Sequence, residues 1–203
     1  MDDKQRTERF RQTKERMEEE GYVGRECTIS VLRANVMAFV TAGPVAVLCA
    51  VVFFFVNGGI SFRFDAWELF VVLLIFIASI FIHEGLHGLT WSRFSENGWR
   101  DIHIGVMWEK LTPFCCCMKP LTFGKYLLGS LMPFLVLGLG LFLAALFAKS
   151  EMLLLCSLYN ILSAGGDTTI ACILLKHRHA VIIDHPTECG FLSLIHISEP
   201  TRL

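Results

Sequence analysis

Two histidines and a glutamate form a short pattern near the end of an apolar stretch. Residues 83–88 read HEGLHG. Residues i and i+4 share one face of an α-helix, so His83 and His87 can present two imidazoles to one metal ion. Glu84 borders that face, where its carboxylate can accept a proton from a water molecule. This HExxH pattern predicts a zinc hydrolase site, with His83 and His87 as metal ligands and Glu84 as the catalytic base.

The apolar setting favours the metal interpretation. Each ionisable residue inside a membrane-spanning helix costs about 2.5–3.5 kcal/mol on insertion scales. Three such residues in one apolar stretch need a compensating partner, and a bound cation supplies one. The alternative is a hydrogen-bonded histidine pair near the water interface, which requires no metal.

A catalytic zinc ion takes three protein ligands and leaves one position open for water. Asp167, in the sequence SAGGD, is the best candidate for the third ligand. His83 and Asp167 lie 16 and 15 residues from the predicted outer ends of their apolar stretches, so both should lie about 23 Å deep. Gly165 and Gly166 would let the backbone approach closely. The alternative, a helix break capped by Asp167, would not explain a carboxylate deep in an apolar stretch.

Other polar residues are weaker candidates. Asn160 precedes Asp167 by two helical turns. It either hydrogen-bonds a substrate backbone or a ligand carboxylate, or it packs between helices, and both interpretations stay open. Less favoured as ligands are His103, His177, His179 and the run Asp184-His185-Pro186.

The composition is that of a membrane protein. The 203 residues are 54% hydrophobic and only 18% charged, with a mean hydropathy of +0.54, which excludes a disordered chain, a coiled coil and an ordinary soluble enzyme. The net charge of −1 argues against a nucleic-acid partner. A helix needs about 20 apolar residues to cross a bilayer. Four stretches meet that length: 36–56, 67–91, 127–148 and 152–175.

We therefore expect an all-α polytopic membrane protein with four transmembrane helices and a short cytoplasmic β-hairpin-like loop. The loop prediction rests on alternating apolar residues at 102–108, with 111–119 as the returning strand. An edge strand beside a protease site could pair with an extended substrate. An amphipathic segment at the membrane interface is an equal alternative.

Positive charge predicts the orientation of the helices. With Arg202 set aside, the segment before the first span, the loop between 92 and 126 and the stretch after 175 carry 15 lysines and arginines, whereas the other two loops carry only Arg63 and Lys149. Both termini should therefore face the cytoplasm, with a charged segment at 1–35 and a multi-pass membrane domain at 36–191. The expected partners are the lipid bilayer and a membrane-protein substrate, and the sequence holds no indication of the oligomeric state.

Residues 192–202 read LSLIHISEPTR, which looks like the translation of a transposase adapter used in DNA library preparation. We therefore expect 192–203 to be an artefact rather than native sequence, and exclude it from functional reasoning. The alternative is an ordinary short polar tail.

The eight cysteines suggest reduced thiols rather than a disulfide framework. Cys49, Cys156 and Cys172 lie inside apolar stretches, and the three residues from Cys115 to Cys117 are consecutive, which suits no ordinary disulfide pattern. The consecutive cysteines could be lipidated, bind a metal or be buried thiols, and these alternatives stay open.

The combined motifs resemble a known family. HEGLHG followed by Gly-Gly-Asp is similar to the site-2 proteases, which cut substrates within the membrane. The closer resemblance is to small bacterial membrane proteins described as putative zincin peptidases, formerly a domain of unknown function. The features that carry it, over about residues 25–191, are Thr112-Pro113, Asp167, Asp184-His185-Pro186 and Gly190-Phe191. One departure is that site-2 proteases carry Asn-Pro and Asp-Gly where this chain has Asn160-Ile161 and Asp167-Thr168.

These observations predict an intramembrane zinc metalloprotease that hydrolyses peptide bonds of membrane-embedded or membrane-proximal substrates. A non-catalytic membrane protein that binds or transports a metal ion would keep the histidines but would not need Glu84. A catalytically silent, protease-like scaffold is a third alternative.

Overall fold

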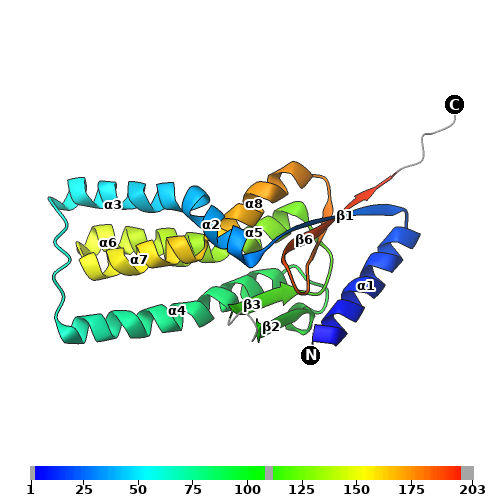
Figure 1. Ribbon diagram of the computed structural model, residues 1–203, viewed down its shortest axis with the longest axis horizontal. Coiled ribbons are helices and arrows are strands. Elements are labelled where there is room, and N and C mark those ends of the chain that lie inside the picture. Colours follow the sequence, from blue (N-terminus) through cyan, green and yellow to red (C-terminus); the bar gives the residue numbers. More distant parts are fainter. Residues whose placement is uncertain (1–2, 108–111, 198–203) are drawn as a thin grey trace.

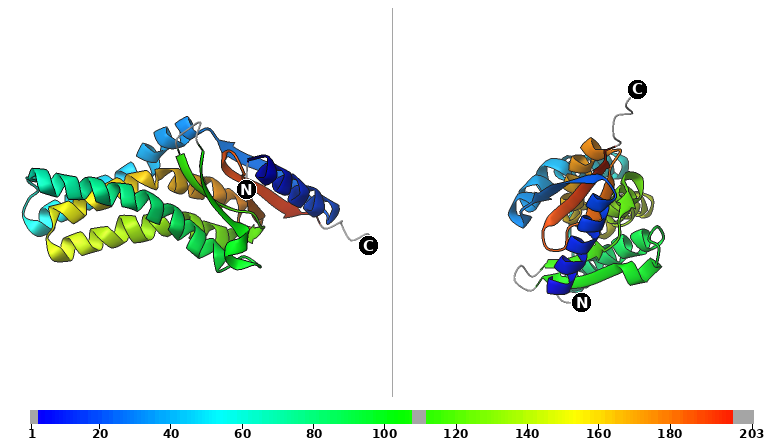
Figure 2. Two further views of the ribbon diagram at one scale, coloured as in Figure 1. Left: turned by 90° about the horizontal axis from the view of Figure 1, so that it is seen from below. Right: turned by 90° about the vertical axis from the view of Figure 1, so that its right-hand side faces the viewer.

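The computed structural model describes residues 3–107 and 112–197. Long helices gather at one end of the elongated molecule, and the strands lie at the other end together with α1 (Asp3–Glu19) (Figure 1). The left-hand view of Figure 2 shows the same division from below. The chain thus separates into a helical part and a part that contains the strands.

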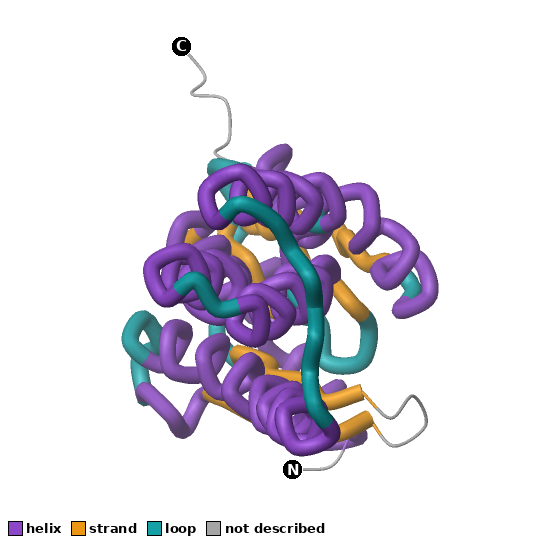
Figure 3. Tube along the Cα trace, turned by 90° about the vertical axis from the view of Figure 1, so that its left-hand side faces the viewer, coloured by secondary structure: helices purple, strands orange, loops and turns teal. Residues whose placement is uncertain are grey.

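Among the described residues, three helical stretches are long and apolar enough to cross a membrane: Val31–Asn57, Ala66–Ser92 and Phe123–Ala148. Their elements are α2 (Val31–Thr41) and α3 (Gly43–Asn57), then α4 (Ala66–Ser92), then α5 (Phe123–Pro133), a π-helical turn (Phe134–Gly140) and α6 (Leu141–Ala148). Figure 3 looks along these helices and shows them grouped as a bundle. Large apolar side chains such as Phe55, Leu73 and Phe81 are exposed on them. The chain is therefore a membrane protein.

Local sequence sets where these helices begin and end. The Ser30 hydroxyl accepts a hydrogen bond from the Arg33 amide at the start of α2. Asp65 and Glu68 form a reciprocal capping box at the start of α4, with distances of 2.8 and 2.9 Å. Gly58 ends α3 in the left-handed conformation, with φ at 81°.

The predicted continuous span at 152–175 is wrong. Glu151–Ser163 form α7 and Gly165–Leu174 form α8, and the two helices are bent by 44° around Ala164. The bend follows from close packing of α8 on α2, because a Cβ atom added to Gly165 would lie 2.1 Å from the Cβ of Ala38. The Thr41 hydroxyl reinforces this contact with a 2.8 Å hydrogen bond to the Thr168 hydroxyl.

The expected all-α, four-span fold class is also wrong. Within the described residues, six strands form two antiparallel sheets, and three continuous helical stretches qualify as spans beside the one bent pair. The larger sheet has the order β1-β6-β5-β4, and its strands are β1 (Tyr22–Ile29), β4 (Leu121–Thr122), β5 (Val181–Asp184) and β6 (Cys189–His196). β1, β4 and the β5–β6 pair come from segments far apart in the sequence, so local periodicity gives little sign of their pairing.

The smaller sheet is the expected hairpin. β2 (Ile102–Met107) pairs with β3 (Thr112–Cys117), and Ile102 lies opposite Cys117. The turn between the two strands lies outside the described residues. Both strands pack beside α4, so the hairpin lies next to the helix that carries the HEGLHG motif.

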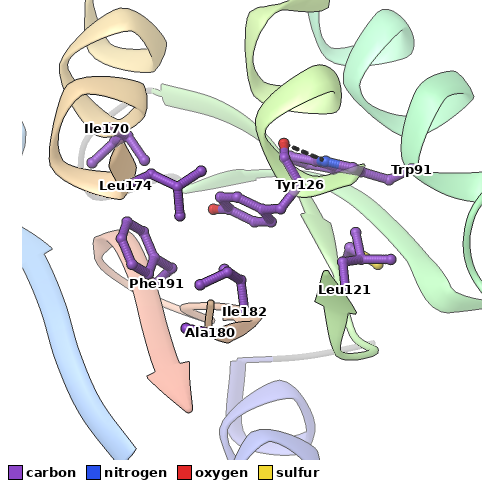
Figure 4. Packing of buried hydrophobic residues seen from close by; sticks show 9 residues of the cluster. Trp91, Leu121, Tyr126, Ile170, Leu174, Ala180, Ile182 and Phe191 are labelled. Carbon is purple, nitrogen blue, oxygen red and sulfur yellow. Dashed lines mark hydrogen bonds between the residues drawn. The ribbon is translucent and has the colours of Figure 1, made fainter. Parts of the chain in front are cut away.

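A buried apolar cluster joins the helices to the larger sheet (Figure 4). Tyr126 of α5 lies in its centre, next to Leu174 of α8 and to Ile182 and Phe191 from the strands. Trp91 of α4 donates a hydrogen bond from its indole to the Tyr126 carbonyl at 3.2 Å. The cluster thereby fixes α4, α5 and α8 relative to one another at the end of the bundle.

The N-terminal helix packs over the strands. The Arg6 guanidinium of α1 lies 4.1 Å from the centre of the Phe114 ring in β3, and the Phe10 ring lies 5.2 Å from that of His185. Leu192 and Leu194 of β6 are buried in a cluster with Phe10. The structure describes residues up to 197, and the artefact expected at 192–203 stays a prediction.

Replacing Gly165 with alanine should separate α8 from α2, because the new methyl group would overlap Ala38. Overpacking of this kind costs about 1–3 kcal/mol. Gly166→Ala is the matched control, since a Cβ at Gly166 meets nothing within 4 Å and gains helix propensity. Thermal unfolding in detergent, followed by circular dichroism, should show a lower midpoint for Gly165→Ala alone. Equal midpoints for the two variants would contradict the packing described.

Candidate active site

Three predicted ligands come together where α4 meets the start of α8. His83 Nε2 lies 3.0 Å from Asp167 Oδ2, and His87 Nε2 lies 3.4 Å from Asp167 Oδ1. The side chains are 12%, 6% and 26% exposed for His83, His87 and Asp167, respectively. The 44° bend after α7 is the local feature that sets the first turn of α8, and therefore Asp167, beside α4.

The hydrogen bonds of His87 define which nitrogen can bind a metal. Its Nδ1 lies 2.8 Å from the Gly129 carbonyl oxygen, and a carbonyl only accepts, so Nδ1 carries the proton. Nε2 of neutral His87 therefore carries a lone pair, which faces a carboxylate oxygen of Asp167 and lies 3.2 Å from Nε2 of His83. Lone pairs that face one another in this way are stabilised by a shared cation.

The donor set fits zinc. One nitrogen from each histidine and one oxygen of Asp167 all lie within 4.8 Å of one another. Bonds of about 2.0–2.1 Å in a tetrahedral site separate ligand atoms by about 3.3 Å. The 3.2 Å between the two Nε2 atoms agrees with that spacing, and the histidines lie 3.0 and 3.4 Å from Oδ2 and Oδ1 of Asp167, respectively. Within the described residues, the group consists of two histidines and one aspartate, so its ligand atoms are nitrogen and oxygen rather than sulfur.

Glu84 lies beside the ligand group and outside it. Its carboxylate lines two cavities of about 180 and 150 Å³, and the backbone amide of Cys115 in β3 lies against it. The larger cavity extends from His87 and Asp167 toward the turn that follows β5. Glu84 and Pro113 line both cavities, so the smaller cavity begins on the other side of Glu84.

The other polar candidates divide into two groups. Asn160 is buried, donates from Nδ2 to the Cys156 carbonyl at 2.8 Å, and lines the smaller cavity. Gly166 lines the larger cavity, whereas Gly165 packs on α2. His103 and His177 lie away from the ligands: His103 lines a separate hollow beside α1, and His177 bonds to Ser193.

Sequence reasoning missed an aromatic stack behind the ligands. The His87 ring stacks on Trp91 with centroids 5.2 Å apart, and Trp91 stacks on Tyr126 at 5.3 Å. The sequence analysis gave Trp91 no role in the site, although its spacing of four residues from His87 is a signal that the two share one helix face. Nothing in the sequence marks Tyr126.

The three consecutive cysteines are buried or half-buried in β3. Burial raises the pKa of each thiol, that of Cys117 to about 12. They are therefore uncharged at neutral pH without a metal, and metal binding would have to displace their protons. Of the alternatives left open by the sequence, buried thiols fit this environment best.

Asp184, at the end of β5, lines the larger cavity. Its Oδ1 accepts a hydrogen bond from the Tyr126 hydroxyl at 2.7 Å, and its Oδ2 accepts one from the Cys117 amide at 3.3 Å. Burial raises the pKa of Asp184 to about 6, against the effect of these hydrogen bonds. The sequence marked this residue only as part of the Asp-His-Pro run.

A membrane helix that carries HExxH and meets an aspartate from a second helix defines a class of metallopeptidase-like membrane proteins. A family model described as "Putative zincin peptidase" matches residues 76–182. The match spans more than half of the chain and includes His83, Glu84, His87 and Asp167, so the chain belongs to that family. No curated protein and no solved structure matches it.

Gly129→Ala should weaken zinc binding through His87. A Cβ at Gly129 would lie 1.9 Å from the Trp91 indole nitrogen, so the tryptophan must move, and the ring stacked on it must follow. Loss of such outer support typically costs about 10- to 100-fold in metal affinity. Gly124→Ala is the matched control in α5, where a Cβ meets nothing within 4 Å. Competition with a zinc chelator measures both affinities, and equal values would show that the stack does not support His87.

Proposed function

We propose that this chain is a zinc metalloprotease that cuts membrane-embedded or membrane-proximal substrates. The observation that carries the proposal is the convergence of His83, His87 and Asp167 next to a glutamate that lines a cavity without joining the ligands. Membership of the zincin peptidase family supports the peptidase class. The apolar helices that hold the site support a substrate reached from the bilayer.

The ligand residues would hold zinc through Nε2 of His83, Nε2 of His87 and a carboxylate oxygen of Asp167. A zinc ion there supplies Lewis acidity and lowers the pKa of water toward about 7. Glu84 accepts a proton from the attacking water at its carboxylate and then donates it to the leaving amine nitrogen. The Cys115 amide beside Glu84 helps to orient that carboxylate.

The outer edge of β3, which is not paired with β2, supports an extended substrate. Among the described strands, β3 pairs only with β2, and its other edge directs the Cys115 and Cys117 amides toward Glu84 and Asp184. Because these amides already bond to the two carboxylates, a peptide would run alongside this edge, over Glu84 and Asp184, and would expose its carbonyl groups beside Glu84. Pro113 suits the same edge because it has no N–H to leave unpaired.

A metal-binding or metal-transporting protein is the alternative from another class. It needs the three ligands but has no use for a carboxylate that lies beside them. Glu84 therefore separates the two functions, and its place on two cavities favours the protease. A silent scaffold would tolerate the loss of Glu84 without any change in its role.

The orientation proposed from the sequence places the N-terminus and β3 in the cytoplasm. The uneven distribution of lysine and arginine supports it. In this orientation α4 runs from outside to inside, so His83 and Glu84 lie toward the cytoplasmic end of their helix. The larger cavity would then open toward the cytoplasm.

Glu84→Gln tests the catalytic assignment. Glutamine keeps nearly the same shape and can still hydrogen-bond, but it cannot accept the proton. Cleavage of a membrane-peptide substrate should fall by about 10²–10⁴-fold, while zinc content measured on the purified protein stays unchanged. Glu68→Gln, at the other end of α4, is the matched control and should cleave normally. Full activity in Glu84→Gln would remove the base assignment, and loss of zinc would make Glu84 a ligand.

Reporter fusions test the orientation. Reporters joined at the N-terminus and at residue 110 should indicate the cytoplasm, and a reporter at Gly59 should indicate the outside, because positive charge is retained on the cytoplasmic side. An external signal from residue 110 would show that the helices have the opposite orientation, with the larger cavity toward the cell exterior.

A further inference from the structure

The end of the larger cavity contains a carboxylate that the proposed reaction does not use. Asp184 lines the same cavity as His87 and Asp167 and is held in place by the Tyr126 hydroxyl and the Cys117 amide. A carboxylate has about four acceptor positions. These two hydrogen bonds, together with the Cys116 thiol near Asp184, leave acceptor capacity for a ligand in the cavity.

No described lysine or arginine in the cavity balances the charge of Asp184. The described residues that line the cavity include the carboxylates of Glu84, Asp167 and Asp184 and the imidazoles of His87 and His185, but no lysine or arginine. Within the described part of the chain, no lysine or arginine forms an ion pair with Asp184. Burial raises the pKa of Asp184 to about 6, so it is mostly ionised at neutral pH and would be stabilised by a cation that entered the cavity.

Glu84 and Asp184 contact backbone amides that lie two residues apart in β3. The Cys115 amide lies against Glu84, and the Cys117 amide donates to Asp184. Two residues of a strand span about 6.6 Å. A peptide extended along β3, with its cleaved bond beside Glu84, would therefore bring a side chain about two residues away close to Asp184.

We propose that Asp184 determines specificity by binding a lysine or arginine side chain of the substrate about two residues from the cleaved bond. This inference rests on the proposed protease function and adds a substrate class to it. Segments that leave the membrane on the cytoplasmic side commonly carry lysine and arginine there. The preferred substrate is thus a membrane segment with a basic cytoplasmic flank, cut near that flank.

Binding without turnover provides the test. The Glu84→Gln protein, loaded with zinc in a zwitterionic detergent, is titrated with two fluorescent peptides, each an alanine- and leucine-rich span of about 20 residues. One ends in a flank of three lysines and the other in three glutamines. Fluorescence anisotropy should show about tenfold tighter binding of the lysine peptide.

Two second-site changes identify the responsible residue. Asp184→Asn in the same background keeps an oxygen that can accept from Tyr126, so the fold is preserved while the charge is lost. It should bind the two peptides equally. Glu26→Gln, which removes an exposed carboxylate of β1 outside the cavity, should retain the preference.

A lysine preference that survives Asp184→Asn would overturn the inference, and so would a parent protein that binds both peptides equally or binds neither. The chain with Glu84 intact is then offered the same peptides for cleavage. Selective binding without any cleavage would overturn the protease function while supporting Asp184 as a cation-binding residue. Cleavage of both peptides at equal rates, with equal binding, would overturn the inference alone.

Discussion

The structure depends on one constraint: two imidazole nitrogens and a carboxylate oxygen converge inside an apolar bundle. The Gly129 carbonyl fixes a proton on Nδ1 of His87, on the far side of its ring, so Nε2 is the nitrogen that faces the carboxylate of Asp167 and is available to a metal ion. Such an arrangement is costly in an apolar environment unless a cation is shared among the three side chains. The proposed zinc ion satisfies all three ligands at once.

The helix packing around the site brings the three ligand side chains together. Gly165 lets α8 approach α2 closely and turn away from α7, which brings Asp167 beside α4. The stack of His87, Trp91 and Tyr126 then links the ligand face of α4 to α5, and the Tyr126 hydroxyl reaches Asp184 of the larger sheet. Ligands in the membrane helices and a carboxylate in the strand-containing part thereby line one cavity.

Local periodicity predicted the parts of this arrangement that lie within one helix. The four-residue spacing of His83 and His87 placed both imidazoles on one face, and equal depth in two helices led to Asp167. The bend at Ala164 was missed because the Gly-Gly pair is compatible with either a straight or a broken helix, and only the contact with Ala38 decides between them. The β1–β6 pairing and the place of Tyr126 were missed because both depend on segments far apart in the chain.

The most direct test of the metal centre is X-ray absorption at the zinc edge, on purified protein loaded with one zinc per chain. Two imidazoles and a carboxylate predict a shell of nitrogen and oxygen neighbours at about 2.0–2.1 Å, with the scattering typical of imidazole rings. Cys115, Cys116 and Cys117 lie in β3 nearby, so an alternative site would be visible in the same spectrum. Sulfur neighbours at about 2.3 Å would contradict the assignment of His83, His87 and Asp167.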